Sequence, residues 1–171
     1  METKIQIAIQ DANILIDLVK LEILGKFFSL PYQFLTTNLV LAELYEEQIA
    51  LFQVFISSGT FRVIDVQPAA LSIIQQLSLQ DPKPSIQDWS VLHYAKQLNA
   101  ILMTGDNPLR KVAMAHGIEV CGILRILDEL IDARVISESE ACTLLKRLRT
   151  INRRLPAKEC ASREDKWCGK K

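Results

Sequence analysis

The sequence predicts a three-layer α/β/α fold, with helices on both sides of a central parallel sheet of four or five strands and extra helices at the C-terminus. Apolar runs of strand length alternate along the chain with segments of helical length, which is the pattern of successive βαβ units. Turn-forming residues separate the two kinds of segment. Hydrophobic residues make up 49% of the chain, which is enough for a real core.

The predicted strands are short apolar runs bounded by turn signals. Pro31 precedes the second run and Gly59 precedes the third. Gly117 precedes the fifth, where it fits the position just after the end of a helix. The five runs are residues 5–10, 32–36, 61–66, 100–104 and 118–121.

The predicted helices lie between these strands and beyond the last one. Thr36 or Thr37 is a candidate cap for the second helix, and Pro68 suits the first turn of the third. Ser137 and Glu140 resemble a capping box at the start of the last helix. The helical segments are residues 12–28 (one helix or two short ones), 38–57, 68–79, 85–98, 107–116, 123–133 and 138–154.

At 171 residues the chain is predicted to be one domain. We expect residues 1–136 to form its main α/β part, and residues 137–171 to be a C-terminal helix and a basic, polar tail appended to it. The tail from Pro156 is expected to be loosely ordered unless a partner or a groove takes the indole of Trp167. No apolar run reaches the roughly 20 residues that cross a bilayer, and we see no signal peptide. These features favour a cytoplasmic protein with no membrane partner.

Formal charge is balanced, with 20 basic and 20 acidic residues, but its distribution is uneven. Basic residues crowd the last quarter of the chain, which leaves the remainder net acidic. This stretch is either an arm that binds phosphate groups or the solvated face of a helix, and the sequence favours neither. Its members are Lys146, Arg147, Arg149, Arg153, Arg154 and Lys158.

The four cysteines, Cys121, Cys142, Cys160 and Cys168, form no C-x-x-C pair. In a chain expected to be intracellular, we predict that they are free thiols. A structural zinc site is not favoured, because the two histidines lie far along the chain from the last two cysteines and such sites have closely spaced ligands.

Two aspartates stand where a predicted strand ends and a helix begins. Asp11 follows residues 5–10, and Asp106 follows residues 100–104 after one glycine. If both runs are parallel strands of one sheet, both carboxylates emerge at its carboxyl edge, where open α/β sheets bind ligands. Gathered carboxylates raise one another's pKa, and a divalent cation removes that conflict. Ligands that are all oxygen indicate Mg²⁺ or Mn²⁺ rather than zinc.

Two further acidic residues share a predicted helix face with apolar side chains. Asp88 lies one turn before Leu92, and Glu43 lies one turn after Leu39. A carboxylate that faces a core needs a partner, and no Lys or Arg lies one turn away on either face. A metal shared with the two strand-end aspartates meets that need. Each of the four acids, taken alone, also has an ordinary explanation as a helix cap, a first-turn charge or a solvated side chain.

The order and surroundings of these four acids resemble the PIN domain, a family of metal-dependent ribonucleases. Residues 11–18 are similar to its first motif, an aspartate followed by a small polar residue and an apolar helix. Residues 39–44 are similar to its second, a glutamate in the helix after the second strand. Residues 88–96 are similar to its third, an aspartate that opens a helix continuing to Ala-Lys. Residues 104–110 are similar to its fourth, T-x-D followed by leucine and arginine.

The resemblance covers residues 5–125, and it departs from the family at Pro82 and Pro84, beside the expected site. It implies an endoribonuclease whose Mg²⁺ or Mn²⁺ activates water for the hydrolysis of single-stranded or structured RNA. The four acids would be catalytic, with the two strand-end aspartates as direct metal ligands and the two helix acids completing the set directly or through water. The helices beyond Gly122 resemble a subgroup of toxins from type II toxin–antitoxin pairs, which implies a small antitoxin partner; a homodimer is a further expectation.

Polar and basic neighbours of the four acids are candidates for supporting roles. Asn13, Thr104 and Asn107 would orient a water or a carboxylate, although such residues also favour helix starts. The candidates for RNA binding are also explained by plain surface charge. They are Arg110, Lys111, Arg149, Arg153 and Arg154.

Two other classes of protein stay open. A PIN-like binding or regulatory module with weak catalysis would act through protein partners. A receiver-like domain would need an acidic pair after its first strand and a lysine near its last, whereas Gln10 precedes Asp11 and Cys121-Gly122 offers no lysine. Metal-dependent cleavage of RNA separates the ribonuclease from both.

Overall fold

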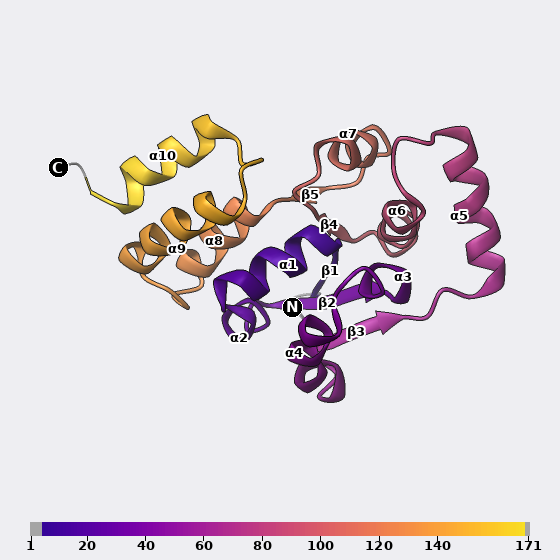
Figure 1. The fold of residues 1–171 in the computed structure, drawn as a ribbon, viewed down its shortest axis with the longest axis horizontal. Coiled ribbons are helices and arrows are strands. Elements are labelled where there is room, and N and C mark those ends of the chain that lie inside the picture. The colour runs from indigo at the N-terminus through magenta and orange to yellow at the C-terminus, as the bar shows by residue number, and fades with distance from the viewer. Residues whose placement is uncertain (1–4, 170–171) are drawn as a thin grey trace.

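The five predicted strands form one sheet in the computed structural model, which describes residues 5–169 (Figure 1). The strands are β1 (Gln6–Gln10), β2 (Tyr32–Thr37), β3 (Phe61–Ile64), β4 (Ile101–Met103) and β5 (Val120–Cys121). Every neighbouring pair is parallel, and the order across the sheet is β3-β2-β1-β4-β5. Ala8 of β1 pairs with Phe34 of β2 on one side and with Ile101 of β4 on the other, so β1 lies at the centre.

Helices cover both faces of this sheet. Those before the last strand are α1 (Ala12–Leu21), α2 (Leu24–Phe27), α3 (Asn38–Leu41), α4 (Glu46–Ser57), α5 (Pro68–Gln80), α6 (Ile86–Leu98) and α7 (Asn107–Ala115). On one face α1 packs against α4, and on the other α6 packs against β1, β2 and β4, with α5 beyond it (Figure 1). The predicted three-layer α/β/α architecture is therefore confirmed.

The core lies between the sheet and its two helix layers. Ala8 and Ile9 of β1 are completely buried, as expected for a central strand that is covered on both faces. Ile14, Leu15 and Leu18 of α1 are also completely buried, because their spacing places them on one face of the helix. This packing holds the end of β1 and the start of α1 in a fixed relation.

The predicted helix over residues 38–57 is wrong, because the chain forms two helices separated by residues 42–45. Thr37 caps α3 by accepting a hydrogen bond from the backbone N–H of Val40 at 3.2 Å. A second helix start follows, where the Gln48 side chain accepts from the backbone N–H of Tyr45 at 3.0 Å. Each of these local caps favours a new helix over continuation of the first.

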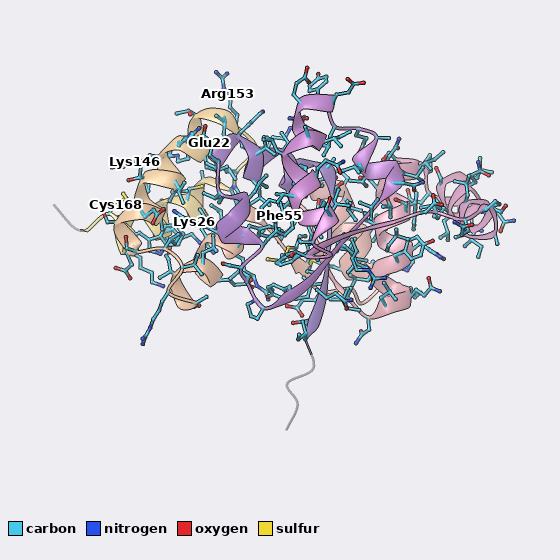
Figure 2. The ribbon with its side chains drawn as sticks, turned by 90° about the horizontal axis from the view of Figure 1, so that it is seen from below. Glu22, Lys26, Phe55, Lys146, Arg153 and Cys168 are labelled. Atoms are coloured by element: carbon cyan, nitrogen blue, oxygen red, sulfur yellow. A yellow bond between two sulfur atoms is a disulfide. The ribbon has the colours of Figure 1, made fainter. Side chains whose placement is uncertain are left out.

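The C-terminal helices α8 (Ile123–Asp132), α9 (Glu138–Ile151) and α10 (Ala157–Trp167) stack beyond α1 and α2, away from the sheet (Figure 1). Arg147 of α9 forms an ion pair of 3.1 Å with Glu22, and Lys26 of α2 forms one with Glu140 (Figure 2). These contacts dock the C-terminal helices on the first helical layer. No helix within residues 5–169 has both the length and the apolar character needed to span a bilayer.

The C-terminal tail is helical over most of its length rather than loose. Its Trp167 is only 4% exposed, so a groove takes the indole, which is the condition under which order was expected. The preceding helix also ends earlier than predicted, at Ile151 instead of residue 154. The turn that follows brings α10 back against α9.

The prediction of four free thiols is wrong for two of them. Cys142 of α9 is bonded to Cys168 at the end of α10 (Figure 2). Cys121 and Cys160 are free and buried. The pairing depends on α10 folding back along α9, and a separation of 26 residues in the sequence does not reveal that contact.

This disulfide should make a measurable contribution to stability. Replacing Cys168 by serine is expected to lower the free energy of unfolding by about 3 kcal/mol, because the bond restricts the unfolded chain. Urea denaturation under non-reducing conditions measures the change, and wild-type protein in reductant should match the variant. Thiols can be counted in unreduced wild-type protein that is denatured in the presence of a thiol-blocking reagent. Four reactive thiols instead of two would show that the bond does not form.

Candidate functional site

The candidate site lies where the order of the strands reverses. From β1 the chain crosses to β2 on one side, whereas β4 lies on the other side, so the carboxyl ends of β1 and β4 flank a topological switch point. Open α/β sheets bind their ligands in the crevice at this point. Asp11 follows β1 directly, and its backbone N–H donates to the Met103 carbonyl at the end of β4 at 3.0 Å. Asp106 follows β4, so the fold brings both strand-end aspartates to this edge.

Thr104 joins the two strand ends. Its hydroxyl, which is completely buried, donates to Asp11 Oδ2 at 2.8 Å and accepts from the backbone N–H of Asp106 at 3.0 Å. The Asn13 side chain makes a second link, because it donates to Asp11 Oδ2 and accepts from the backbone N–H of Gly105 at 2.7 Å. Together these bonds fix Asp11 and Asp106 relative to each other.

Both strand-end aspartates also cap helices. Asp11 accepts from the backbone N–H of Ala12 at 2.7 Å at the start of α1, and it is only 3% exposed. Asp106 Oδ1 accepts from the backbone N–H of Leu109 at 2.8 Å at the start of α7. Its Oδ2 atom accepts no hydrogen bond within residues 5–169, and the residue is half-buried. The capping explanation and the ligand explanation therefore apply to the same side chains.

Asp88 reaches the edge from α6. It forms a capping box with Ser85, in which Asp88 Oδ2 accepts from the Ser85 backbone N–H at 2.8 Å and the Ser85 hydroxyl accepts from the Asp88 N–H at 3.0 Å. A buried hydrogen bond of 2.7 Å between Thr37 at the end of β2 and Ser90 fixes the first turns of α6 against the sheet. Neither residue was predicted to belong to the site, although Thr37 stands at a strand end and Ser90 within an apolar helical stretch.

Glu43 was predicted to lie on a helix face. It lies instead in the break between α3 and α4, where it is exposed. The cause is the second helix start at Tyr45, which unwinds the segment around it. Its carboxylate still interacts electrostatically with those of Asp11 and Asp88. Partial burial, and then the charge of Asp88, raise the pKa of Glu43.

Crowding and burial together disfavour negative charge at this edge. Burial is the main cause that raises the pKa of Asp11 from 3.8 to about 7, and the charges of Asp88 and Glu43 add to it. The hydrogen bonds from Thr104 and Ala12 act in the opposite direction, because they favour the ionised form.

The same causes act on Asp88. Burial raises its pKa, its two hydrogen bonds with Ser85 lower it, and the charge of Asp106 raises it. Asp88 is thus coupled to Asp11, Glu43 and Asp106. The four predicted acids form one electrostatic cluster, although they come from four separate segments.

The chemistry of the cluster suits a hard divalent cation. Its ligands are all carboxylate oxygens, and within residues 5–169 no Lys or Arg forms an ion pair with any of the four. The geometry is more open than a finished metal site, since no three His, Cys, Asp or Glu side chains in the described chain are close enough together to hold an ion. Cation binding would therefore require the carboxylates to close in from their present positions.

The basic residues that were predicted as candidates for RNA binding do not form one continuous surface. Arg149 forms an ion pair with Glu164 of α10 at 2.5 Å, so its charge is used within the C-terminal helices. Arg153 and Lys111 are exposed. Arg110 and Arg154 line a cavity that opens beside Asp106, as does the third polar candidate, Asn107. Two further lining residues, Arg125 and Arg163, were not predicted, because only the packing of α8 and α10 places them there.

Comparison with protein families gives one clear match. A family model described as a PIN domain matches residues 7–167. The match includes the sheet, the four acids and α10, and it runs across the predicted boundary at residue 136. A search of curated proteins found no match.

The raised pKa of Asp11 predicts a pH-dependent stability in metal-free protein. The folded state keeps a proton on Asp11 up to about pH 7, whereas the unfolded state loses it near 3.8. The free energy of unfolding should therefore fall between these pH values, by up to about 4 kcal/mol, and level off above them. Asp11→Asn keeps the cap on Ala12 and removes the charge, so it should remove the contribution of Asp11 to this fall, whereas the contributions of Asp88 and Glu43, whose pKa values are also raised, should remain.

Urea denaturation in EDTA at about pH 5 and pH 8 makes the comparison. The exposed Asp165→Asn on α10 is the matched control and should keep the wild-type profile. If Asp11→Asn also keeps that profile, Asp11 does not carry the destabilising charge.

Proposed function

Because the chain belongs to the PIN-domain family, whose members are in general nucleases, we propose that it is a metal-dependent endoribonuclease that hydrolyses phosphodiester bonds in single-stranded or structured RNA. The observation that carries this proposal is the coupling of four carboxylates at the carboxyl edge of the sheet, without a basic partner within residues 5–169. Such a cluster stores negative charge that a cation would offset.

In this proposal Asp11 and Asp106 are the direct ligands of Mg²⁺ or Mn²⁺, and Asp88 and Glu43 complete the set directly or through water. When bound, the cation would activate water and stabilise the charge that develops on the phosphate. The chain contributes the positioning. Thr104 holds the Asp11 carboxylate at the edge through its 2.8 Å hydrogen bond and holds the Asp106 backbone through its second bond.

We further propose a cytoplasmic toxin that is controlled by a small antitoxin protein. The sequence resemblance of the helices beyond Gly122 to a toxin subgroup supports this role, and the exposed Arg153 would suit an acidic segment of such a partner. A homodimer is supported by large apolar side chains that are exposed at α4, where Tyr45, Leu51 and Val54 are 76%, 51% and 66% exposed.

A second candidate function is a PIN-like binding or regulatory module with weak catalysis. The open arrangement of the carboxylates favours it, because no three of the described metal-binding side chains are close enough together to hold an ion. Such a module would bind partners without requiring metal. Cleavage of RNA that depends on added Mg²⁺ or Mn²⁺ and is abolished by EDTA decides between the two.

The ribonuclease proposal predicts that Asp11→Asn and Asp106→Asn each reduce metal-dependent RNA cleavage by more than about 100-fold while the protein stays folded. A loss in rate of about this size is expected when a group that stabilises the charge of the transition state is removed. Both asparagines retain the ability to cap α1 and α7, so circular dichroism should be unchanged.

Cleavage of total RNA by purified protein, followed by sequencing of the new ends, measures activity and reveals the target. The Asp165→Asn protein controls for the loss of a carboxylate elsewhere. Full activity in both site variants would overturn the assignment of the two aspartates.

A further inference from the structure

A cavity of about 430 Å³ opens beside the carboxylate cluster. Gly105 and Asn107, the residues on either side of Asp106, form part of its wall. The rest comes from β5, α7, the first two turns of α8 and α10, and the segment that joins α9 to α10. Its volume lies within the range of about 300 to 1,000 Å³ that is typical of pockets for small ligands, so it can admit more than a single ion.

Four arginines line this cavity, and two of them hold its walls together. Arg163 of α10 donates to Asp128 of α8 at 2.6 Å and lies 3.5 Å from Glu159, which also lines the cavity. Arg125 of α8 pairs with Glu119 at 2.8 Å. The two acids of the wall are thus both engaged by Arg163.

The other two arginines, Arg110 and Arg154, form no ion pair within residues 5–169. They come from different parts of the chain, α7 and the segment between α9 and α10, yet both line this cavity. Two uncompensated cations on one concave surface favour an anionic ligand.

The backbone adds positive charge at the same place. Gly122 and Pro156 are the N-cap residues of α8 and α10, neither helix has a side-chain cap, and both residues line the cavity. The first turn of an uncapped helix presents unpaired N–H groups and the positive end of its dipole. Arg110 Nη1 lies so close to the start of α8 that a β-carbon at position 122 would approach it to 3.1 Å. The guanidinium thus adds its charge to the positive end of α8, and this combination favours an anion at the same place.

We propose that this cavity binds a phosphate group of the RNA strand, next to the phosphodiester bond that lies at the carboxylate cluster. The inference rests on the proposed function and adds a substrate subsite to it. The cavity shares the Asp106 turn with the cluster, so a strand that crosses the cluster carries a neighbouring phosphate to Arg110 and Arg154. The acidic cluster repels RNA, and this subsite supplies the attraction that holds the strand.

The test measures binding of a fluorescein-labelled single-stranded oligouridylate in EDTA, where cleavage does not contribute. Arg110→Gln and Arg154→Gln should each weaken binding about three- to tenfold. Each should also reduce the slope of log Kd against log salt by about 0.7, the value for one lost phosphate contact on a single strand. Neither arginine has an ion pair to lose within residues 5–169, so folding should be unaffected, and thermal unfolding checks this.

Arg153→Gln is the matched control. Arg153 is adjacent to Arg154 and is likewise exposed, but its side chain points away from the molecule and does not line the cavity (Figure 2). The Arg153→Gln variant loses the same charge, but from outside the cavity. Its slope of log Kd against log salt should therefore stay at the wild-type value. An equal loss in all three variants would show general attraction by net charge and would overturn the subsite.

Two further measurements separate the possible outcomes. If inorganic phosphate binds through Arg110 and Arg154 while the oligouridylate binds equally well to both variants, the cavity is a site for free phosphate and the proposed RNA subsite is wrong. If RNA binding depends on both arginines but no metal restores cleavage, the subsite stands and the nuclease function fails. If RNA is cleaved in a metal-dependent way but the salt slopes of both arginine variants are unchanged, the nuclease function stands and the subsite is wrong.

Discussion

The parallel pairing of β1 with β4 is the constraint on which the rest of the site depends. It brings two strand ends together at the switch point of the sheet, and the Thr104 hydroxyl then bridges Asp11 and the backbone of Asp106. Residues about 90 positions apart in the sequence acquire a fixed relation through this single buried side chain. The helix that carries Asp88 and the segment that carries Glu43 are placed by packing on the same sheet, so the cluster follows from the topology.

The cost of this arrangement falls on Asp11. It is almost fully buried beside other acids, and hydrogen bonds from Thr104 and Ala12 only partly offset the effect of that burial on its pKa. A fold selected for stability alone would place a neutral cap here, since asparagine caps a helix as well as aspartate does. The retained carboxylate is therefore better explained by a demand for charge than by helix capping, and functional sites are where such local conflict is expected.

The sheet was predictable from the sequence because each strand is a short apolar run with a turn signal, and all five runs were found. The strand-end positions of Asp11 and Asp106 followed directly from those runs. Glu43 was misplaced because the local caps at Thr37 and Tyr45 divide a segment whose composition favours one continuous helix. The Cys142–Cys168 bond and the helical structure of α10 were missed for another reason. Both arise from contacts between helices, which no local pattern in the sequence specifies.

The C-terminal helices show how packing changes the meaning of a charge run. In the sequence, Arg149 and Arg154 belong to one basic stretch, but Arg149 is engaged by Glu164 and only Arg154 reaches the cavity beside the carboxylate edge. Arg110 arrives there from α7, outside the stretch altogether. A count of charges along the chain therefore predicts the wrong surface. What matters is which cations the folded chain leaves unpaired, and within residues 5–169 Arg110 and Arg154 are two that line the cavity beside the turn that carries Asp106.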